Sequence, residues 1–172
     1  NSDDVEAKTF LEYKADKKIT FGFTDQNSIN GKVVKSSLFE NVLVIVGQKE
    51  TVIEFKNGGP FVLENALAAV AVAYSLGIDL SVSKSALEKN SLVPGRFEIV
   101  SKEPLIIVDY AHTIAAVEKL LSFVRKNWDG DIIHIFGAAG GGRDKWKRPK
   151  LAELSEKYTD FSILSEENSF DE

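Results

Sequence analysis

The spacing of apolar residues changes near residue 94, which divides the sequence into two patterns. Before that point, apolar residues at helical spacing predict a helix over residues 3–13. Short apolar runs follow, separated by turn residues such as Asn30-Gly31. These runs predict strands over residues 18–23, 31–37, 41–47 and 51–55.

A long Ala- and Val-rich segment follows the predicted strands. Residues 61–77 are apolar on every side of a helical wheel and end at Gly77. A helix with that pattern is typically buried on all sides, so we expect this one in the core. A short capped helix is predicted over residues 81–90.

Beyond the turn signal Pro94-Gly95, strand and helix patterns alternate. Continuous apolar runs over residues 104–109 and 131–137 predict strands buried on both faces. A third strand is predicted over residues 160–166. Helices are predicted over residues 113–127 and 147–158. This alternation favours parallel strands with right-handed crossovers, the start of a doubly wound α/β sheet. Three strands leave unpaired edges, so we expect the fold to continue past Glu172.

Composition limits the classes of function. The 172 residues are 44% hydrophobic and 27% charged, with a net charge of −5. That charge argues against a nucleic-acid binder or a membrane-surface binder, and no apolar run is long enough to span a bilayer. There is no Cys, which excludes a thiolate metal site or a disulfide framework and fits a reducing cytosol. There is also no Met, so we expect the chain to be a piece of a longer protein.

Polar residues follow each strand of the second pattern. They lie at residues 109–113, in the loop 137–149, and at 166–168. Ligands of open α/β sheets bind beyond the carboxyl ends of the strands, so we expect the three clusters to meet at one rim.

Each cluster also has a purely structural explanation. Asp109 or Thr113 suits the N-cap of the following helix, and His112 suits an exposed loop. Asn65 suits a local bond at a helix end. A solvated face is the ordinary role of a run of cations such as Lys145, Lys147, Arg148 and Lys150.

The loop "GAAGGGRDKWKRP" comes close to a phosphate-binding P-loop but departs from it. Arg143 and Asp144 stand where that motif needs Lys and Ser/Thr, and an Asp there would repel a triphosphate. We therefore do not expect this loop to be the main ATP cradle. The guanidinium of Arg143 matches a carboxylate or a phosphate in two-point contact.

Taken together, the chain resembles the Mur ligase family. The matching stretches, in family order, are "NSDD", "ENALAAVAVAYSLGI", "VPGRFE", "VDYAHT" and "GAAGGGRDKWKRP". The branch it resembles most comprises the UDP-N-acetylmuramoyl-dipeptide ligases, which add the third residue of the peptidoglycan stem peptide.

The resemblance implies an α/β fold in two parts. Residues 1–94 would be the second half of a central mixed-sheet ATPase domain, and residues 95–172 the start of a Rossmann-like, parallel-sheet C-terminal domain. The family P-loop and the ligands for Mg²⁺ would lie upstream of Asn1, so this piece alone should not catalyse the family reaction. The implied partners are ATP, a UDP-N-acetylmuramoyl-dipeptide, a free amino acid and the remainder of the polypeptide, in the cytoplasm.

The resemblance also implies roles for residues. The ATP site would contain Asn65 at adenine, Asp109 at the ribose, Arg96 at the phosphates, and Tyr110. The catalytic residues would be Arg96, which reaches the phosphates from the hinge, and His112, which lines the cleft between domains together with Tyr110. The site for the incoming amino acid would contain Arg143 on its carboxylate, with Lys145 and Asn168.

Two departures from the family pattern stand out. Ile114 and Ala115 replace a common Pro-Asp, and Phe170 occupies the place of an arginine found in diaminopimelate-adding members. Lysine, diaminopimelate or another diamine therefore remain open as substrates. Two alternatives also remain: another branch, such as folylpolyglutamate or cyanophycin synthetases, and a non-catalytic nucleotide-binding module.

Overall fold

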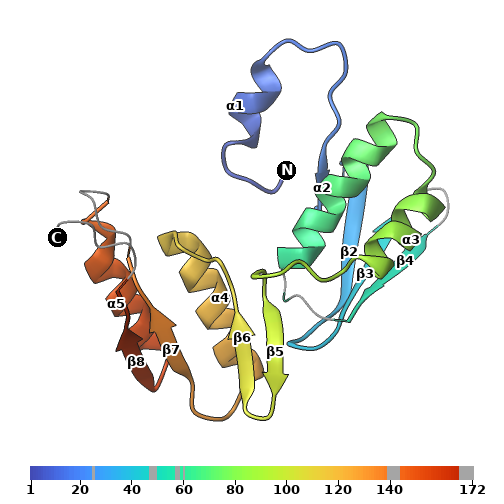
Figure 1. Ribbon diagram of the computed structural model, residues 1–172. Helices are drawn as coiled ribbons and strands as arrows, with labels where there is room; N and C mark the ends of the chain where they lie inside the picture. Colours follow the sequence, from blue (N-terminus) through green and yellow to red (C-terminus); the bar gives the residue numbers. More distant parts are fainter. Residues whose placement is uncertain (25, 47–49, 57–58, 60, 139–143, 167–172) are drawn as a thin grey trace. The chain divides into compact units, whose positions relative to one another are not determined.

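The computed structural model contains two compact units, Asn1–Asp109 and Tyr110–Glu172 (Figure 1). It describes residues 1–24, 26–46, 50–56, 59, 61–138 and 144–166. The domain boundary predicted between residues 94 and 95 stays a prediction.

The first unit is built on a four-stranded sheet in the order β1-β2-β3-β4. Its strands are β1 (Phe21–Gly22), β2 (Ile29–Ser36), β3 (Asn41–Val46) and β4 (Thr51–Phe55). β1 runs parallel to β2, and the other pairs are antiparallel. The predicted strands are therefore present, although β1 covers only two residues of the range expected for it.

The N-terminal segment is tied to β1 by Asp3. Its carboxylate accepts hydrogen bonds from the backbone N–H of Phe23 at 2.6 Å and the hydroxyl of Thr24 at 2.6 Å. The bond from Thr24, followed by that from Phe23, lowers the pKa of Asp3. The helix α1 (Ala7–Glu12) begins only after this segment and is shorter than the predicted helix.

Two helices pack on the sheet, α2 (Phe61–Ser75) and α3 (Leu80–Lys89) (Figure 1). The core lies between α2 and the inward-facing side chains of the sheet, and it consists of Ile29, Leu43, Ile45, Ile53, Phe55, Leu63, Ala66, Leu67, Val70 and Ala71. Asp79 caps α3, since its side chain accepts from the N–H of Ser81 at 2.8 Å.

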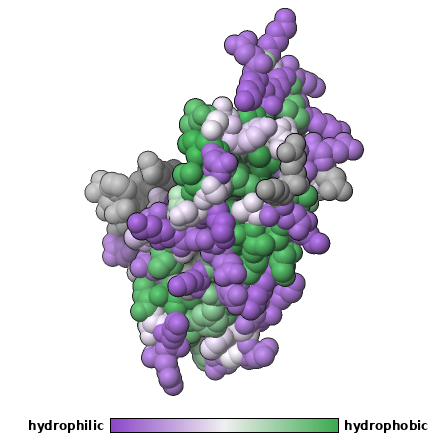
Figure 2. All heavy atoms as spheres, turned by 90° about the vertical axis from the view of Figure 1, so that its right-hand side faces the viewer, coloured by the Kyte–Doolittle hydropathy of each residue, from purple (hydrophilic) through white to green (hydrophobic). Residues whose placement is uncertain are grey.

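The prediction that the α2 helix is buried on all sides is wrong for the part of the chain that the structure describes. Only the face that meets the sheet is buried, and Val72 is 61% exposed. Small Ala residues made the sequence pattern uniform, whereas the sheet covers a single face. Figure 2 shows apolar side chains reaching the molecular surface among polar ones.

The first unit ends in an antiparallel hairpin of β5 (Glu98–Lys102) and β6 (Leu105–Val108). The sequence predicted β6 as the first of a parallel series and missed β5. The observed partner of β6 is β5, because Pro104 lies in a tight connection between two short extended runs. Half-buried and exposed residues alternate along β6, so β6 is not buried on both faces.

The second unit contains α4 (Ile114–Asn127), β7 (Ile133–Phe136), α5 (Lys147–Tyr158) and β8 (Phe161–Leu164). β7 and β8 pair in parallel, with α5 between them in sequence, as the alternating pattern predicted. The helices pack through Val117, Leu121, Leu151 and Leu154, with Phe136 from β7 against this cluster.

The expectation that β7 is buried on both faces is wrong within the described residues. Ile133 is 60% and Ile135 66% exposed, whereas the intervening His134 is partly covered. The helices cover the face that carries His134 and Phe136. A continuous apolar run cannot by itself reveal which face is covered.

No helix among the described residues is both long and apolar enough to cross a membrane.

Candidate functional site

The predicted site residues occupy loops and element ends in both units. Asn65 lies on the exposed side of α2, which removes the need for a buried partner. Arg96 is exposed in the loop before β5, and Asp109 follows β6 directly. Tyr110 and His112 lie between β6 and α4.

The structure describes only part of the predicted site for the incoming amino acid. Arg143 and Asn168 lie outside the described residues. Lys145 is exposed in the turn that leads into α5, where the N–H of Arg148 donates to its carbonyl at 3.1 Å. The convergence of Asp109, Arg143 and Asn168 on one rim therefore stays a prediction.

The loop that carries Arg96 begins with a tight turn. The N–H of Arg96 donates to the carbonyl of Val93 at 3.0 Å, which closes a four-residue turn. Pro94 occupies its second position, and Gly95 occupies the third with a φ of +68°. Proline followed by a residue of positive φ is typical of a type II turn, so the sequence itself selects this shape.

Two carboxylates hold the backbone on either side of Arg96. Oε2 of Glu98 accepts from the N–H of Gly95 at 2.7 Å. Oδ2 of Asp109 accepts from the N–H of Phe97 at 2.7 Å. The strand register explains the arrangement, because Glu98 pairs with Val108 and so lies next to Asp109.

Phe97 fixes the loop from its apolar side. It has a φ of +46°, which is unusual for a bulky side chain, and it is only 1% exposed. Its ring lies so close to Gly59 that a Cβ built on Gly59 would stand 2.8 Å from Cδ2 of Phe97. A left-handed backbone at such a residue persists only when its surroundings impose it.

Sequence reasoning missed Glu98 and Phe97 as parts of the site. Both lie in the stretch "VPGRFE", which was noted only for its turn and its arginine. A carboxylate three residues after the turn glycine was an available signal. The left-handed conformation of Phe97 had no signal in the sequence.

The Tyr110–His112 segment has a defined local geometry. Nδ1 of His112 lies 3.0 Å from the carbonyl of Tyr110, and the two rings meet edge-on with centroids 4.9 Å apart. Because a carbonyl only accepts, Nδ1 carries the proton in this contact, and Nε2 of the neutral ring is an acceptor.

Thr113 is the N-cap of α4. Its side chain accepts from the N–H of Ala116 at 3.3 Å, and the helix begins at Ile114. The capping explanation is therefore confirmed for Thr113, whereas the carboxylate of Asp109 is bonded to Phe97 instead. Ile114 and Ala115 enter the helix without the Pro-Asp common in the family.

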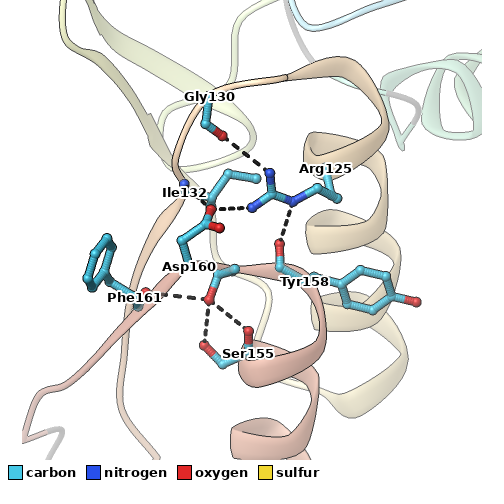
Figure 3. Close-up of polar contacts among 8 residues, drawn as sticks. Arg125, Gly130, Ile132, Ser155, Tyr158, Asp160 and Phe161 are labelled. Atoms are coloured by element: carbon cyan, nitrogen blue, oxygen red, sulfur yellow. Dashed lines mark hydrogen bonds and ion pairs between the residues drawn. The ribbon is translucent and has the colours of Figure 1, made fainter.

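Another polar cluster joins the starts of β7 and β8 in the second unit (Figure 3). The guanidinium of Arg125 donates to the carbonyls of Tyr158 at 3.0 Å and Gly130 at 3.2 Å, and it pairs with Asp160. Asp160 also accepts from the N–H of Ile132 at 2.8 Å. This backbone bond, followed by that from Arg125, lowers the pKa of Asp160.

A further polar group lies between β7, β8 and α5. Nδ1 of His134 lies 2.9 Å from the hydroxyl of Ser155, which lies 2.7 Å from that of Ser162. Burial lowers the pKa of His134, and Ser155 is fully buried. All three side chains have partners inside the unit, so we assign them a structural role.

No group of three His, Asp or Glu side chains among the described residues is placed to hold a metal ion.

Comparison with protein families matches residues 95–172 to the Mur ligase glutamate ligase domain. Two curated relatives are UDP-N-acetylmuramoyl-L-alanyl-D-glutamate–2,6-diaminopimelate ligases. The one from Alkaliphilus oremlandii is 36% identical over 98% of this chain and 36% of its own length. The one from Aquifex aeolicus is 38% identical over 100% of this chain and 35% of its own. The chain thus spans about a third of these relatives.

Solved structures agree at the level of the fold. A UDP-N-acetylmuramoyl-L-alanyl-D-glutamate–2,6-diaminopimelate ligase matches with a TM-score of 0.62 and 26% identity, over 97% of this chain and 36% of the other. A UDP-N-acetylmuramoylalanyl-D-glutamyl-2,6-diaminopimelate–D-alanyl-D-alanyl ligase from Acinetobacter baumannii matches with a TM-score of 0.69 and 21% identity, over 87% of this chain and 34% of the other. At 21% identity, the second match shows a similarity of fold alone.

Proposed function

The chain belongs to the Mur ligase family, and we propose that it is part of an ATP-dependent ligase that adds an amino acid to a UDP-N-acetylmuramoyl-dipeptide in peptidoglycan synthesis. In this proposal, residues 1–94 are the second half of the central ATP-binding domain, and residues 95–172 begin the C-terminal domain. The start of the family match at residue 95 supports that division. Because ATP and nucleotide-linked precursors are intracellular, we place the reaction in the cytoplasm.

The observation that best supports an ATP site is the construction of the loop around Arg96. The side chain is exposed, while the amides on both sides are held by the carboxylates of Glu98 and Asp109 at 2.7 Å. A guanidinium offered from a fixed backbone suits a phosphate, because less freedom is lost when the anion binds.

The other proposed contacts follow from exposure and hydrogen-bonding capacity. The exposed amide of Asn65 suits the adenine edge, and the carboxylate of Asp109 suits a ribose hydroxyl. Tyr110 completes the ATP site, and Nε2 of His112 offers an acceptor nearby in sequence. We propose Arg143, Lys145 and Asn168 for the incoming amino acid.

The proposed reaction has two steps. The γ-phosphoryl group of ATP passes to the carboxylate of the dipeptide, giving an acyl phosphate and ADP. The amine then attacks the acyl carbon and loses a proton, and the tetrahedral intermediate expels inorganic phosphate as the amide forms. Arg96 would offset the negative charge on the transferred phosphoryl group, where fixed cations contribute most to catalysis.

Two amino acids are candidates for the incoming substrate. The curated relatives are named for 2,6-diaminopimelate, which makes it the first candidate. Phe170 replaces an arginine that would hold the distal carboxylate, which makes lysine the second candidate. Lysine has no distal carboxylate, so it does not need that arginine.

Phosphate release by the full-length gene product tests the proposal. We expect release to need ATP, the dipeptide nucleotide and one of the two amino acids together, with an amide product confirmed by mass. Phosphate release without either acceptor, or no amide with any diamine, would contradict it. The fragment 1–172 alone, as a matched control, is expected to be inactive.

A non-catalytic nucleotide-binding module and another branch, such as folylpolyglutamate or cyanophycin synthetases, are the alternatives. Sequence upstream of Asn1 without a P-loop would favour the module. Turnover with a folate or with a peptide of aspartate would favour the other branches.

A further inference from the structure

The loop from Gly95 to Glu98 contains more fixed points than a surface connection needs. Gly95 has a positive φ, and carboxylates accept from the backbone N–H groups of Gly95 and Phe97. The side chain of Phe97 is buried. Arg96 is the exposed side chain in the middle of this construction.

We propose that Gly95 and Glu98 are positioning residues for Arg96, which set the direction from which its guanidinium reaches the nucleotide phosphates. The inference rests on the proposed function for the role of Arg96. It goes further by assigning the nucleotide affinity to the backbone of the turn, through two residues that do not themselves touch the nucleotide.

Gly95 determines the path of the chain into Arg96. Its φ of +68° is a conformation that glycine adopts freely and that other residues resist. A Cβ added at Gly95 meets no atom of the described residues within 4 Å, so none of their side chains occupies the space beside it. The need for glycine is therefore purely conformational.

Glu98 holds the same turn from the strand. Its carboxylate accepts from the N–H of Gly95 at 2.7 Å, and β5 fixes Glu98 itself opposite Val108. A charged acceptor makes a stronger bond to an amide than a neutral one, which suits a loop that is open to water.

Phe97 prevents the loop from relaxing in the other direction. The buried ring against Gly59 and the bond from its amide to Asp109 keep its φ at +46°. With Gly95 held on one side and Phe97 on the other, the Cα of Arg96 has one path. The strain at Phe97 is of the kind that accumulates at ligand sites.

The chain offers a matched control for Gly95. Gly77, after α2, has a φ of +75°, and a Cβ added there also meets no atom within 4 Å in the part of the chain that the structure describes. Gly77→Ala and Gly95→Ala therefore impose the same kind of backbone strain without a clash, but only Gly95 precedes Arg96.

The test measures KM for ATP and KM for the amino acid in the full-length enzyme, with the melting temperature as a check on folding. We expect Gly95→Ala to raise KM for ATP about fivefold or more, with KM for the amino acid unchanged. Both variants are expected to lower the melting temperature by similar amounts, but Gly77→Ala should leave both KM values unchanged. An equal rise in KM for ATP in both variants would overturn the proposal.

A double variant tests whether Gly95 acts through Arg96. Once Arg96→Ala has removed the guanidinium, adding Gly95→Ala is expected to raise KM for ATP no further. Effects that multiply would show that Gly95 acts on its own and would overturn the proposal.

Glu98 gives an independent arm if Gly95→Ala does not fold. Glu98→Gln keeps an oxygen that accepts from Gly95, so its KM for ATP should stay within about threefold of the wild type, whereas Glu98→Ala should match Gly95→Ala. Equal KM values in the two Glu98 variants would overturn the proposal. A wild-type enzyme that forms no amide with ATP would instead refute the proposed function, so the two failures are distinguishable.

Discussion

The carboxylate of Asp109 accepts a hydrogen bond from the backbone N–H of Phe97 at 2.7 Å, so the end of β6 holds the loop that carries Arg96. The resemblance to the Mur ligases suggested Asp109 only as a ribose ligand. The structure adds a second task for the same side chain, which any mutation of Asp109 will disturb as well.

Asp109 variants should therefore separate the two tasks. We expect Asp109→Ala to weaken ATP binding and to lower stability by about 1–3 kcal/mol, because the N–H of Phe97 loses its acceptor. Asp109→Asn keeps an acceptor oxygen and should retain most of the stability. Calorimetric titration with ATP and thermal unfolding measure the two effects, and unchanged ATP affinity in Asp109→Ala would remove Asp109 from the nucleotide site.

Arg143 is predicted to bind the carboxylate of the incoming amino acid. Changing it to Ala should raise KM for the amino acid at least tenfold, about the cost of one charge-assisted bond, and leave KM for ATP nearly unchanged. Lys150→Ala removes an exposed cation of α5 that pairs with Glu153 and lies outside the proposed site, so it is the control and should leave both KM values nearly unchanged. In Arg143→Ala, a parallel rise in KM for ATP and KM for the amino acid would count against Arg143 as the ligand of the amino-acid carboxylate.

Asp160 should make stability depend on pH in the acid range. Its pKa is lowered in the folded state by the N–H of Ile132 and by Arg125, so the folded state binds fewer protons. The stabilisation is complete above the unfolded pKa of about 3.9 and is lost as the pH falls through the folded value. We expect Asp160→Asn to unfold at a lower urea concentration at pH 7, and its free energy of unfolding to fall less steeply below pH 4. A dependence on acid pH identical to that of the wild type would refute this role.

His134 should act in a higher pH window. Burial lowers its pKa in the folded state, so the unfolded chain binds the proton more readily. The stabilisation is present above the unfolded pKa of about 6.5 and is lost as the pH falls through the folded value. His134→Gln, which retains a polar side chain near Ser155, should abolish the loss of stability below pH 6.5. Unfolding curves from pH 5 to 8 check this, and an unchanged pH dependence would exclude His134 as its source.

The secondary structure followed closely from the sequence where local signals agreed. The spacing of apolar residues predicted β2, β3, β4, α3, α4 and α5 to within a few residues. Local chemistry also decided the turn at Pro94-Gly95 and the cap at Thr113. β5 escaped prediction because "EIVSK" lies beside a turn and shows no strong apolar run.

Burial was the less predictable property. The apolar patterns of α2, β6 and β7 suggested elements covered on every side, but neighbours cover only part of each one. Composition records how much surface an element is able to bury, whereas the neighbours decide how much it does bury.

By itself, the sequence determined the α/β class, the order of most elements, the family and the residue types available for chemistry, because these depend on local periodicity and short motifs. Only the tertiary structure decided that Asp109 holds Phe97, that Glu98 holds Gly95, and that Phe97 lies buried against Gly59 in a left-handed conformation. Those contacts need the β5–β6 register and the packing of the loop on the first unit. Both arise from free energies summed over residues far apart in the chain, which no local pattern records.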